Sequence, residues 1–289
     1  MRMNNKENAG DLLCTDEERL LISRAAEYCI RGENSAVALS FLTPREQRLI
    51  YESTVRAGNG DRLFFWGGCV GAERRRAVFL PSWLSADGPC SSALYSEERE
   101  EFFLELLYEN GMTDILCEFV RPLKLIGSGY ATLSHRDYLG ALMALGLKRS
   151  VVGDICIEGN SAVVFCEEKT CDFIAAELRK AGRDTLKCEK MQTDLDFHPV
   201  RNFREISTTV ASPRIDGVVR ALCNVSREEA ARLVTQGVVE VNYFVQKETD
   251  RTVSAGDIIS VRGYGKFIID QADGVTRRAR IRLLARKYV

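Results

Sequence analysis

The sequence has few of the residues that build metal and catalytic sites. It holds only two histidines, His135 and His198, and its ten cysteines include no C-x-x-C pair, so the spacing of a zinc finger is absent. The polar first residues, 1–11, lack the apolar core of a signal peptide, and no apolar run approaches the roughly 18 residues of a membrane span. These absences predict a cytoplasmic protein that has reduced cysteines, does not associate with membranes and binds neither a metal nor a cofactor.

Charge is distributed unevenly along the 289 residues, although the net charge is only −1. Residues 199–289 hold 16 Lys and Arg against 10 Asp and Glu, whereas the remaining 198 residues hold 24 against 31. Because a basic segment attracts phosphate, the C-terminal third is the part of the chain predicted to meet nucleic acid.

The C-terminal third also has the clearest secondary-structure pattern. Apolar residues recur at i, i+3, i+4 and i+7 over residues 215–222, which predicts a helix with one buried face. Ser226 is expected to cap a second, short helix, with Glu229 completing a capping box and Gly237 ending the helix. Strand-like segments follow at 239–241 and 258–261, so the pattern predicts two helices packed on a small β-ribbon.

The order of these elements, with the R-I-D sequence at Arg214 and the S-R-x-x-A sequence at Ser226, resembles the S4 domain. This RNA-binding module occurs in ribosomal proteins, RNA-modifying enzymes and tyrosyl-tRNA synthetases, and the resemblance covers residues 213–268. It implies that Arg214 and Arg227 lie together on the exposed side of the helix pair and contact RNA phosphates. It also implies that Asp216 orients Arg214 or caps the first helix.

Further basic residues of the same segment extend the predicted RNA-binding set. Asn242 suits the turn between strands, and the next position, usually Gly in S4 domains, is Tyr243 here. Residues 269–289 form a basic extension, for which an RNA-facing tail is favoured over a solvated edge. The RNA-binding candidates are Arg214, Asp216, Ser226, Arg227, Asn242, Lys247, Arg262, Lys266, Arg277, Arg278 and Arg280.

Upstream of residue 199, helices and strands alternate. The predicted helices are 15–32, 43–57, 97–110, 134–147 and 170–181, and the predicted strands are 63–66, 77–80, 115–120, 154–158, 162–167 and 185–188. This order indicates an α+β sandwich with helices on one face of a mostly antiparallel sheet. The predicted regions are an N-terminal helical region (1–61), a central domain (62–196), a linker (197–212), the S4 domain (213–268) and the extension (269–289).

Three motifs in this region resemble the YlmH family: F-L-T-P-R-E-Q at 41–47, A-E-R-R-R-A at 72–77 and L-S-H-R-D-Y-L-G-A-L at 133–142. The resemblance covers nearly the whole chain. It implies a helical N-terminal region, a central α/β sandwich like an RNA-recognition motif, and an S4 domain that binds the large ribosomal subunit carrying peptidyl-tRNA. The implied role is ribosome quality control, in which tRNA is held while the nascent chain of a stalled ribosome is extended.

An enzymatic interpretation centres on His135-Arg136-Asp137, which occurs in kinase catalytic loops and is close to the aspartate motif of pseudouridine synthases. The glycine-rich loop, strand lysine and D-F-G of kinases are missing, and pseudouridine synthases have one more residue between Arg and Asp. Ser134 and Asp137 instead predict a helix start whose first turn, with His135 and Arg136, is a candidate second RNA or tRNA surface.

We therefore predict a monomeric RNA-binding protein with no catalytic residues, whose partners are the RNA of the large ribosomal subunit and peptidyl-tRNA. Two alternatives stay open. One is an RNA-modifying enzyme, similar to a pseudouridine synthase, that an S4 domain delivers to its substrate. The other is an adaptor linked to cell division that uses the acidic N-terminal two-thirds of the chain.

Overall fold

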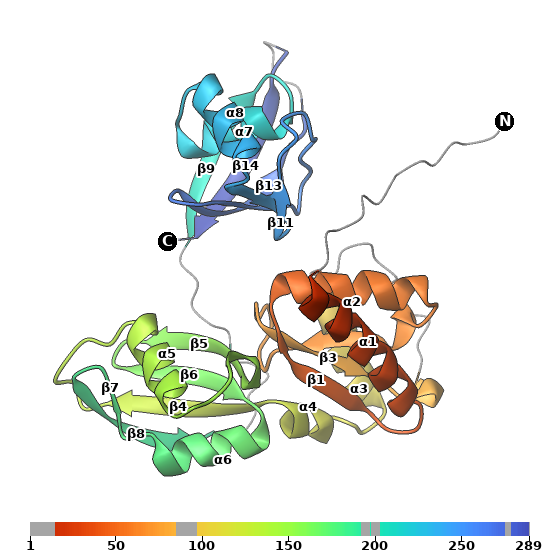
Figure 1. Ribbon diagram of the computed structural model, residues 1–289, viewed down its shortest axis with the longest axis vertical. Helices are drawn as coiled ribbons and strands as arrows, with labels where there is room; N and C mark the ends of the chain where they lie inside the picture. Colours follow the sequence, from red (N-terminus) through yellow and green to blue (C-terminus); the bar gives the residue numbers. More distant parts are fainter. Residues whose placement is uncertain (1–14, 85–96, 192–196, 198–202, 275–278, 289) are drawn as a thin grey trace. The chain divides into compact units, whose positions relative to one another are not determined.

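The computed structural model describes residues 15–84, 97–191, 197, 203–274 and 279–288. The chain forms two compact units, residues 1–199 and 200–289 (Figure 1). The described residues contain eight α-helices and three antiparallel sheets, so the predicted α+β class is confirmed.

The first sheet of the N-terminal unit has the strand order β1-β3-β2. Helices α1 and α2 pack on one face of this sheet and α3 on the other. Capping boxes start α1 and α2, because Thr15 and Thr43 exchange hydrogen bonds with Glu18 and Glu46. The elements are α1 (Asp16–Arg31), β1 (Val37–Leu42), α2 (Pro44–Arg56), η1 (Gly60–Arg62), β2 (Leu63–Trp66), β3 (Arg75–Phe79), η2 (Ser82–Leu84) and α3 (Glu97–Glu109).

Strand β1 corrects the expectation that residues 1–61 are helical. It pairs with β3, so a boundary after residue 61 divides a sheet. Leu39, Phe41 and Leu42 are all buried, because β1 has packed helices on both sides. A strand that is buried on both faces lacks the polar–apolar alternation by which strands are found in a sequence.

The second sheet of this unit has the order β5-β6-β4-β8-β7. Helices α5 and α6 cover one face, where Leu125, Leu142, Val164 and Ile174 share an apolar core. The elements are α4 (Asp114–Phe119), β4 (Arg121–Gly127), α5 (His135–Ala144), η3 (Arg149–Val151), β5 (Val152–Glu158), β6 (Ser161–Cys166), α6 (Glu168–Glu177), β7 (Lys180–Ala181) and β8 (Asp184–Lys190).

The strand predicted at 115–120 is wrong: this segment is helix α4, and the strand β4 follows it. A short apolar run fits a buried strand and a buried helix equally well. Of the helix residues only Leu116 is buried, so α4 contacts the core along one narrow stripe.

The two sheets are joined by a shared apolar cluster and by hydrogen bonds. Val163 and Phe165, on the face of β6 away from α5 and α6, pack with Phe41 and Trp66 of the first sheet. The Asp154 carboxylate of β5 accepts hydrogen bonds from the backbone N–H groups of residues 73 and 74, at 2.7 and 3.0 Å. The sheets therefore belong to one folded unit rather than to separate domains.

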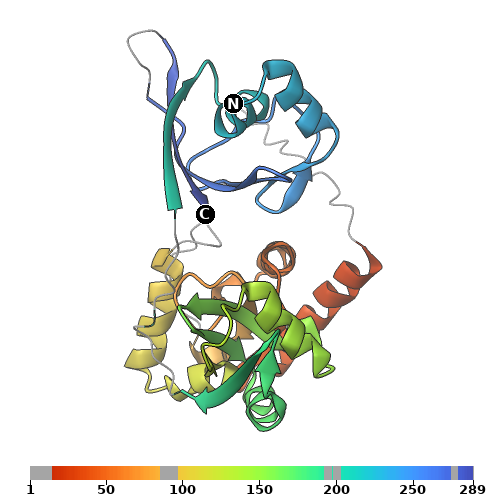
Figure 2. The same ribbon diagram turned by 90° about the vertical axis from the view of Figure 1, so that its left-hand side faces the viewer.

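The C-terminal unit is a six-stranded sheet of order β11-β10-β12-β13-β14-β9. Helices α7 and α8 pack on one face (Figures 1 and 2). The elements are β9 (Phe203–Val210), α7 (Ile215–Cys223), α8 (Arg227–Thr235), β10 (Val239–Val241), β11 (Phe244–Gln246), β12 (Ile258–Val261), β13 (Gly265–Gln271) and β14 (Ile281–Tyr288).

The predicted linker and basic extension both contribute strands to this sheet. Strand β9 lies within 197–212 and strand β14 within 269–289, and the two pair along their full length. Strand β14 is an interior strand, because it also pairs with β13. Arg282 and Arg286 alternate with the buried Leu283 and Ala285, so the segment predicted as a tail has the pattern of an amphipathic strand.

The interior position of β14 predicts that this strand is required for folding. Leu283→Ala should lower the free energy of unfolding by about 2–5 kcal/mol, because it removes buried methyl groups from a packed core. Leu284→Ala is the matched control, since the neighbouring side chain lies on the other face and is half-buried. Denaturant unfolding of both full-length variants measures the difference, and equal losses would contradict the assigned faces.

A buried carboxylate organises one end of the second sheet. Asp184, at the start of β8, is 1 % exposed. It accepts hydrogen bonds from the Ser128 hydroxyl and from the backbone N–H groups of Gly129, at 3.1 Å, and Thr185, at 2.8 Å. The Ser128 hydrogen bond is the largest of the effects that lower the pKa of Asp184.

These hydrogen bonds predict a pH-dependent contribution to stability. A carboxylate whose pKa is lowered in the folded state stabilises the fold above its unfolded pKa of about 3.9, and this contribution disappears as the pH falls through the lowered folded value. The thermal midpoint of the wild type should therefore exceed that of Asp184→Asn at neutral pH, and the difference should shrink towards about pH 3. A difference that does not vary with pH would contradict the ionised role of Asp184.

Candidate nucleic-acid interface

The start of α7 is fixed by the loop that precedes β12. The Ile215 N–H donates to the carbonyl of Arg251 at 2.8 Å, and the Val253 N–H donates to the carbonyl of Pro213 at 2.8 Å. Arg214, between these two contacts, is the N-cap residue of α7. The backbone of Arg214, from which its guanidinium group extends, is therefore held in place by pairing with a loop that is distant in the sequence.

Asp216 holds the Arg214 side chain in place. Arg214 Nε donates to Asp216 Oδ1 at 3.3 Å, and the same oxygen accepts from the Gly217 N–H at 2.9 Å. The Asp216 side chain is 9 % exposed and that of Arg214 is 43 % exposed. The contact therefore joins a buried carboxylate to a partly exposed guanidinium and restricts the direction of the guanidinium group.

Arg227 is the first residue of α8 and is exposed. Ser226 caps this helix through a hydrogen bond that its hydroxyl accepts from the Glu229 N–H at 3.1 Å. In a complete capping box the Glu229 carboxylate would also accept a hydrogen bond from the Ser226 N–H. Here that carboxylate instead forms a bidentate ion pair with Arg232, at 2.9 and 2.8 Å. The capping box is thus only half formed, because Arg232 lies one turn further along the same helix face and competes for the carboxylate.

Both Arg214 and Arg227 stand where a positive charge does not help the helix. The N-terminus of a helix carries a partial positive charge and unsatisfied N–H groups, so a cation there is unfavourable and an anion is favourable. The helix dipole therefore gives no reason for the half-buried Arg214 and the exposed Arg227 to stand at two helix starts in one unit. Their placement suits the binding of an external anion such as a phosphate.

Arg251 lies next to the start of α7, although the sequence did not single it out. Its Nη1 donates to Gln246 Oε1 at 3.1 Å, and its backbone carbonyl accepts from Ile215 at the start of α7. It lies in the loop between β11 and β12, far from Arg214 in the sequence. Nothing in the local sequence marks it, because its position depends on the pairing between that loop and α7.

Two further residues of the predicted set lie in other turns of this unit. Lys247 is exposed just after β11, and a side chain at Gly237 would come within 3.4 Å of its Cε, so Lys247 lies over the turn that follows α8. Arg262 is exposed in the turn between β12 and β13. The structure gives these two side chains positions on the surface but no contact with Arg214 or Arg227.

Both polar atoms of the Asn242 side-chain amide form hydrogen bonds within the C-terminal unit. Its Nδ2 donates to Asp257 Oδ1 at 2.7 Å, and its Oδ1 accepts from the Ile258 N–H at 2.9 Å. Asn242 and Tyr243 both have positive φ, 51° and 68°, as a two-residue turn between strands requires. Tyr243 thus keeps the left-handed conformation for which S4 domains use Gly, and its ring lies 5.0 Å from Lys266 Nζ.

Lys266 lies on the opposite face of the sheet from α7 and α8. Phe267 and Ile269 of β13 are buried beneath the helices, and alternate side chains of a strand point to opposite faces. The Lys266 ammonium lies between the rings of Tyr243 and Tyr288, the second at 4.9 Å. The structure therefore divides the predicted set between two faces.

Arg280, in the segment predicted as a basic tail, forms hydrogen bonds within the sheet. Arg280 donates to the hydroxyl and the carbonyl of Thr209, at 2.9 and 2.7 Å, and so ties the start of β14 to β9. Arg277 and Arg278 lie outside the described residues.

His135 and Arg136 lie in the exposed first turn of α5, in the N-terminal unit. Asp137 of the same motif is occupied with the helix start, because its carboxylate accepts from the Ser134 hydroxyl at 2.6 Å and from the Ser134 N–H at 2.8 Å. These bonds lower the pKa of Asp137. A carboxylate with a lowered pKa is a weaker base, so this geometry favours a capping role over proton transfer.

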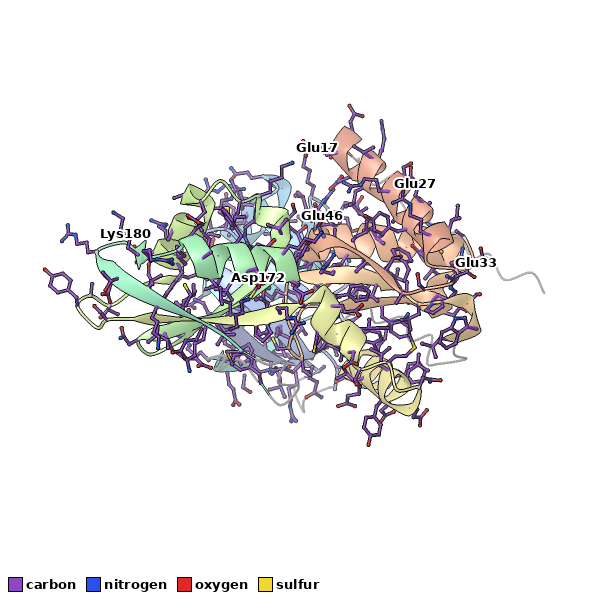
Figure 3. All side chains as sticks on the ribbon, turned by 90° about the horizontal axis from the view of Figure 1, so that it is seen from below. Glu17, Glu27, Glu33, Glu46, Asp172 and Lys180 are labelled. Atoms are coloured by element: carbon purple, nitrogen blue, oxygen red, sulfur yellow. The ribbon has the colours of Figure 1, made fainter. Side chains whose placement is uncertain are left out.

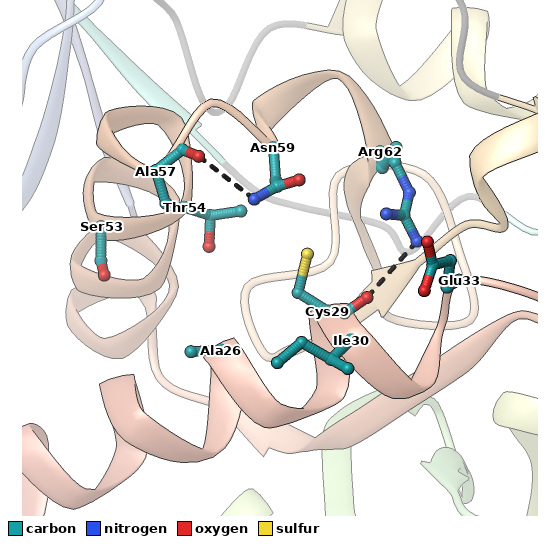
Figure 4. A pocket seen from close by; sticks show the side chains of 9 residues that line it. All are labelled: Ala26, Cys29, Ile30, Glu33, Ser53, Thr54, Ala57, Asn59 and Arg62. Carbon is teal, nitrogen blue, oxygen red and sulfur yellow. Dashed lines mark hydrogen bonds between the residues drawn. The ribbon is translucent and has the colours of Figure 1, made fainter.

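A cavity of about 320 Å³ opens between α1 and the end of α2 (Figure 4). Its polar groups bond to the backbone: Arg62 Nη2 donates to the carbonyls of Cys29 and Gly32, and Asn59 Nδ2 donates to that of Ala57. Burial raises the pKa of the Cys29 thiol, whereas a nucleophilic cysteine needs a lowered one. The cavity therefore has the character of a packing defect.

Within the described parts of the chain, no group of three or more His, Cys, Asp or Glu side chains could hold a metal ion. The cysteines described there are free thiols. No helix in those parts is long and apolar enough to cross a membrane.

A curated relative aligns with almost the whole chain. It is the "Ribosome-associated protein quality control protein P2" of Bacillus subtilis (strain 168), which is 31 % identical over 270 residues, 92 % of this chain and 94 % of the relative. Residues 125–194 match the family described as "Putative RNA-binding domain in YlmH". The chain belongs to the YlmH family.

The YlmH match covers the second sheet of the N-terminal unit with α5 and α6. A solved structure, the "Cell division protein ylmH from Streptococcus pneumoniae", aligns with 62 % of this chain and 93 % of that one, at 15 % identity and a TM-score of 0.43. The residues that match the RNA-binding domain model thus lie in the N-terminal unit, whereas Arg214 and Arg227 lie in the C-terminal unit.

The position of Arg227 predicts an unusual effect of a charge reversal on stability. Arg227→Glu should raise the free energy of unfolding by about 0.3–1 kcal/mol, because a carboxylate interacts favourably with a helix N-terminus. Arg232→Glu on the same helix is the control and should destabilise the protein, since it loses the ion pair with Glu229. Denaturant unfolding of full-length protein measures both, and a destabilised Arg227→Glu would show that Arg227 supports the fold.

Proposed function

We propose that this YlmH-family protein is a non-catalytic RNA-binding factor that acts in ribosome quality control. In this proposal its C-terminal unit is an S4 domain that binds the large ribosomal subunit carrying peptidyl-tRNA. The observation that carries the proposal is the pair of solvent-accessible arginines, the half-buried Arg214 and the exposed Arg227, each at a helix N-terminus. The name of the Bacillus subtilis relative, a ribosome-associated quality control protein, supports the same role.

The proposed recognition is electrostatic and geometric. A guanidinium group can donate two parallel hydrogen bonds to one phosphate, and the helix N–H groups nearby add further donors. Structured RNA is recognised mainly by the shape of its backbone. Asp216 supports this role because it fixes the direction of Arg214 in advance, which reduces the conformational entropy lost on binding.

The alternative of an RNA-modifying enzyme has less support. Asp137, the carboxylate of the motif that is close to a pseudouridine synthase motif, is engaged with the start of α5. The two interpretations are separated by mass spectrometry of ribosomal RNA and tRNA from a strain without the gene. A modification that is missing there and restored by wild-type protein, but not by Asp137→Asn, would replace the binding role with catalysis.

The proposed interface predicts the effect of removing each guanidinium. Arg214→Ala and Arg227→Ala should each weaken binding to large subunits roughly 10- to 100-fold, since a hydrogen bond to a charged group contributes about 1.5–3 kcal/mol. Lys should restore binding only in part, because an ammonium lacks the planar fork. Co-sedimentation of full-length variants with large subunits carrying peptidyl-tRNA measures this effect.

Arg232→Ala is the matched control, because Arg232 lies on the same helix as Arg227 but is paired with Glu229. It should bind large subunits like the wild type. Unchanged binding by both Arg214→Ala and Arg227→Ala would remove this surface from the mechanism.

A further inference from the structure

The helix-free face of the second sheet is closed at its centre. Small α+β RNA-binding domains use aromatic side chains on such a face to stack unpaired bases. Here Val163 and Phe165 of β6 occupy that face, and both are 1 % exposed. They pack against Phe41 and Trp66 of the first sheet. An RNA contact made by this domain therefore needs a different surface.

At one end of the same domain, two loops are joined by hydrogen bonds, and we call them together the loop tip. It consists of residues 128–136, which connect β4 to the first turn of α5, and residues 180–183 around the β7–β8 turn. Asp184 joins them through the Ser128 and Gly129 hydrogen bonds described above. A side chain at Gly182 would come within 3.2 Å of Asp137 Oδ1, so the β7–β8 turn lies against the start of α5.

The loop tip carries one exposed aromatic ring and several exposed cations. Tyr130 is 82 % exposed, on a loop that is hydrogen-bonded to Asp184 through the Gly129 N–H. Arg136, Lys180 and Arg183 of the same loop tip are also exposed, and His135 precedes Arg136. Within the described residues none of these three cations has an acidic partner in a salt bridge, unlike Arg121 or Lys190 of the same sheet.

Lys180 of the loop tip lies at the end of the N-terminal unit opposite Glu17, Glu27 and Glu33 (Figures 1 and 3). Helix α1 also carries Arg19, Arg24 and Arg31, so its net charge is small. The exposed cations of the loop tip are what would attract a polyanion to that end.

We propose that the loop tip binds an unpaired nucleotide of single-stranded RNA. The base stacks on the Tyr130 ring, and Arg136 and Arg183 hold the adjacent phosphates. This site is separate from the Arg214 surface but rests on the proposed function, because it gives the same factor a second RNA contact. Base stacking on an exposed ring flanked by cations is how sequence-tolerant single-strand sites are built.

The test measures binding of full-length protein to a short unstructured oligoribonucleotide by fluorescence anisotropy. Tyr130→Ala should weaken binding about 5- to 100-fold, the range found for the loss of one stacked base, whereas Tyr130→Phe should retain binding. Arg183→Ala should weaken binding and reduce the slope of log affinity against log salt by about 0.7, the value for one phosphate contact on a single strand.

Tyr108→Ala is the matched control, because Tyr108 is 79 % exposed on α3, outside the loop tip. The proposal is overturned if the oligoribonucleotide does not bind, if Tyr130→Ala binds normally, or if Tyr108→Ala weakens binding equally. Selective binding of the loop tip to an acidic peptide instead of the oligoribonucleotide would also overturn it. Thermal midpoints equal to that of the wild type confirm that each variant is folded.

The two proposals fail in different experiments. Arg214→Ala with Arg227→Ala tests the large-subunit interface, and this double variant should still bind the oligoribonucleotide through Tyr130. If Tyr130→Ala binds the oligoribonucleotide normally while the double variant no longer binds large subunits, the loop-tip proposal is wrong and the proposed C-terminal interface is supported. The reverse result would leave the loop tip as the RNA contact and remove the proposed S4 interface.

Discussion

Burial of one face of the six-stranded sheet beneath α7 and α8 determines where each cation of the C-terminal unit lies. Because side chains alternate along a strand, every residue of β13 and β14 is assigned to the helix side or to the open side by the apolar residues beside it. Phe267 and Leu283 face the helices, so Lys266 lies on the open side. The same packing leaves the helix starts, with Arg214 and Arg227, at the surface.

Arg214 and Arg227 illustrate a conflict between stability and binding. A cation at a helix N-terminus opposes the helix dipole, although Ser226 and the Asp216 contact follow the usual rules for helix starts. Residues that break a local rule without a structural gain tend to mark functional sites. In the proposed function, a bound phosphate would supply a negative charge at both helix starts, in addition to the Asp216 carboxylate that already pairs with Arg214.

The N-terminal unit depends on a similar constraint, because one apolar cluster serves both of its sheets. Phe165 lies in that cluster with Trp66, so the sheet face that would suit base stacking is used for folding. At the end of the domain, Asp184 ties residues 128 and 129 to the start of β8. The proposed binding site thus lies apart from the residues that form the shared core.

The sequence by itself determined the features that depend on local pattern: the helices α1, α2, α7 and α8, and the family resemblance carried by contiguous motifs. Tertiary structure decided what local pattern cannot encode. Strand β1 lacked alternation because it is buried on both faces, and a short apolar run could not separate helix α4 from a strand. Strand β14 had a strand pattern, but its interior place follows from pairing with β9, about 70 residues away. Other long-range contacts bring Arg251 to the start of α7 and join the loop tip to Asp184, since such contacts arise only when distant segments share one core.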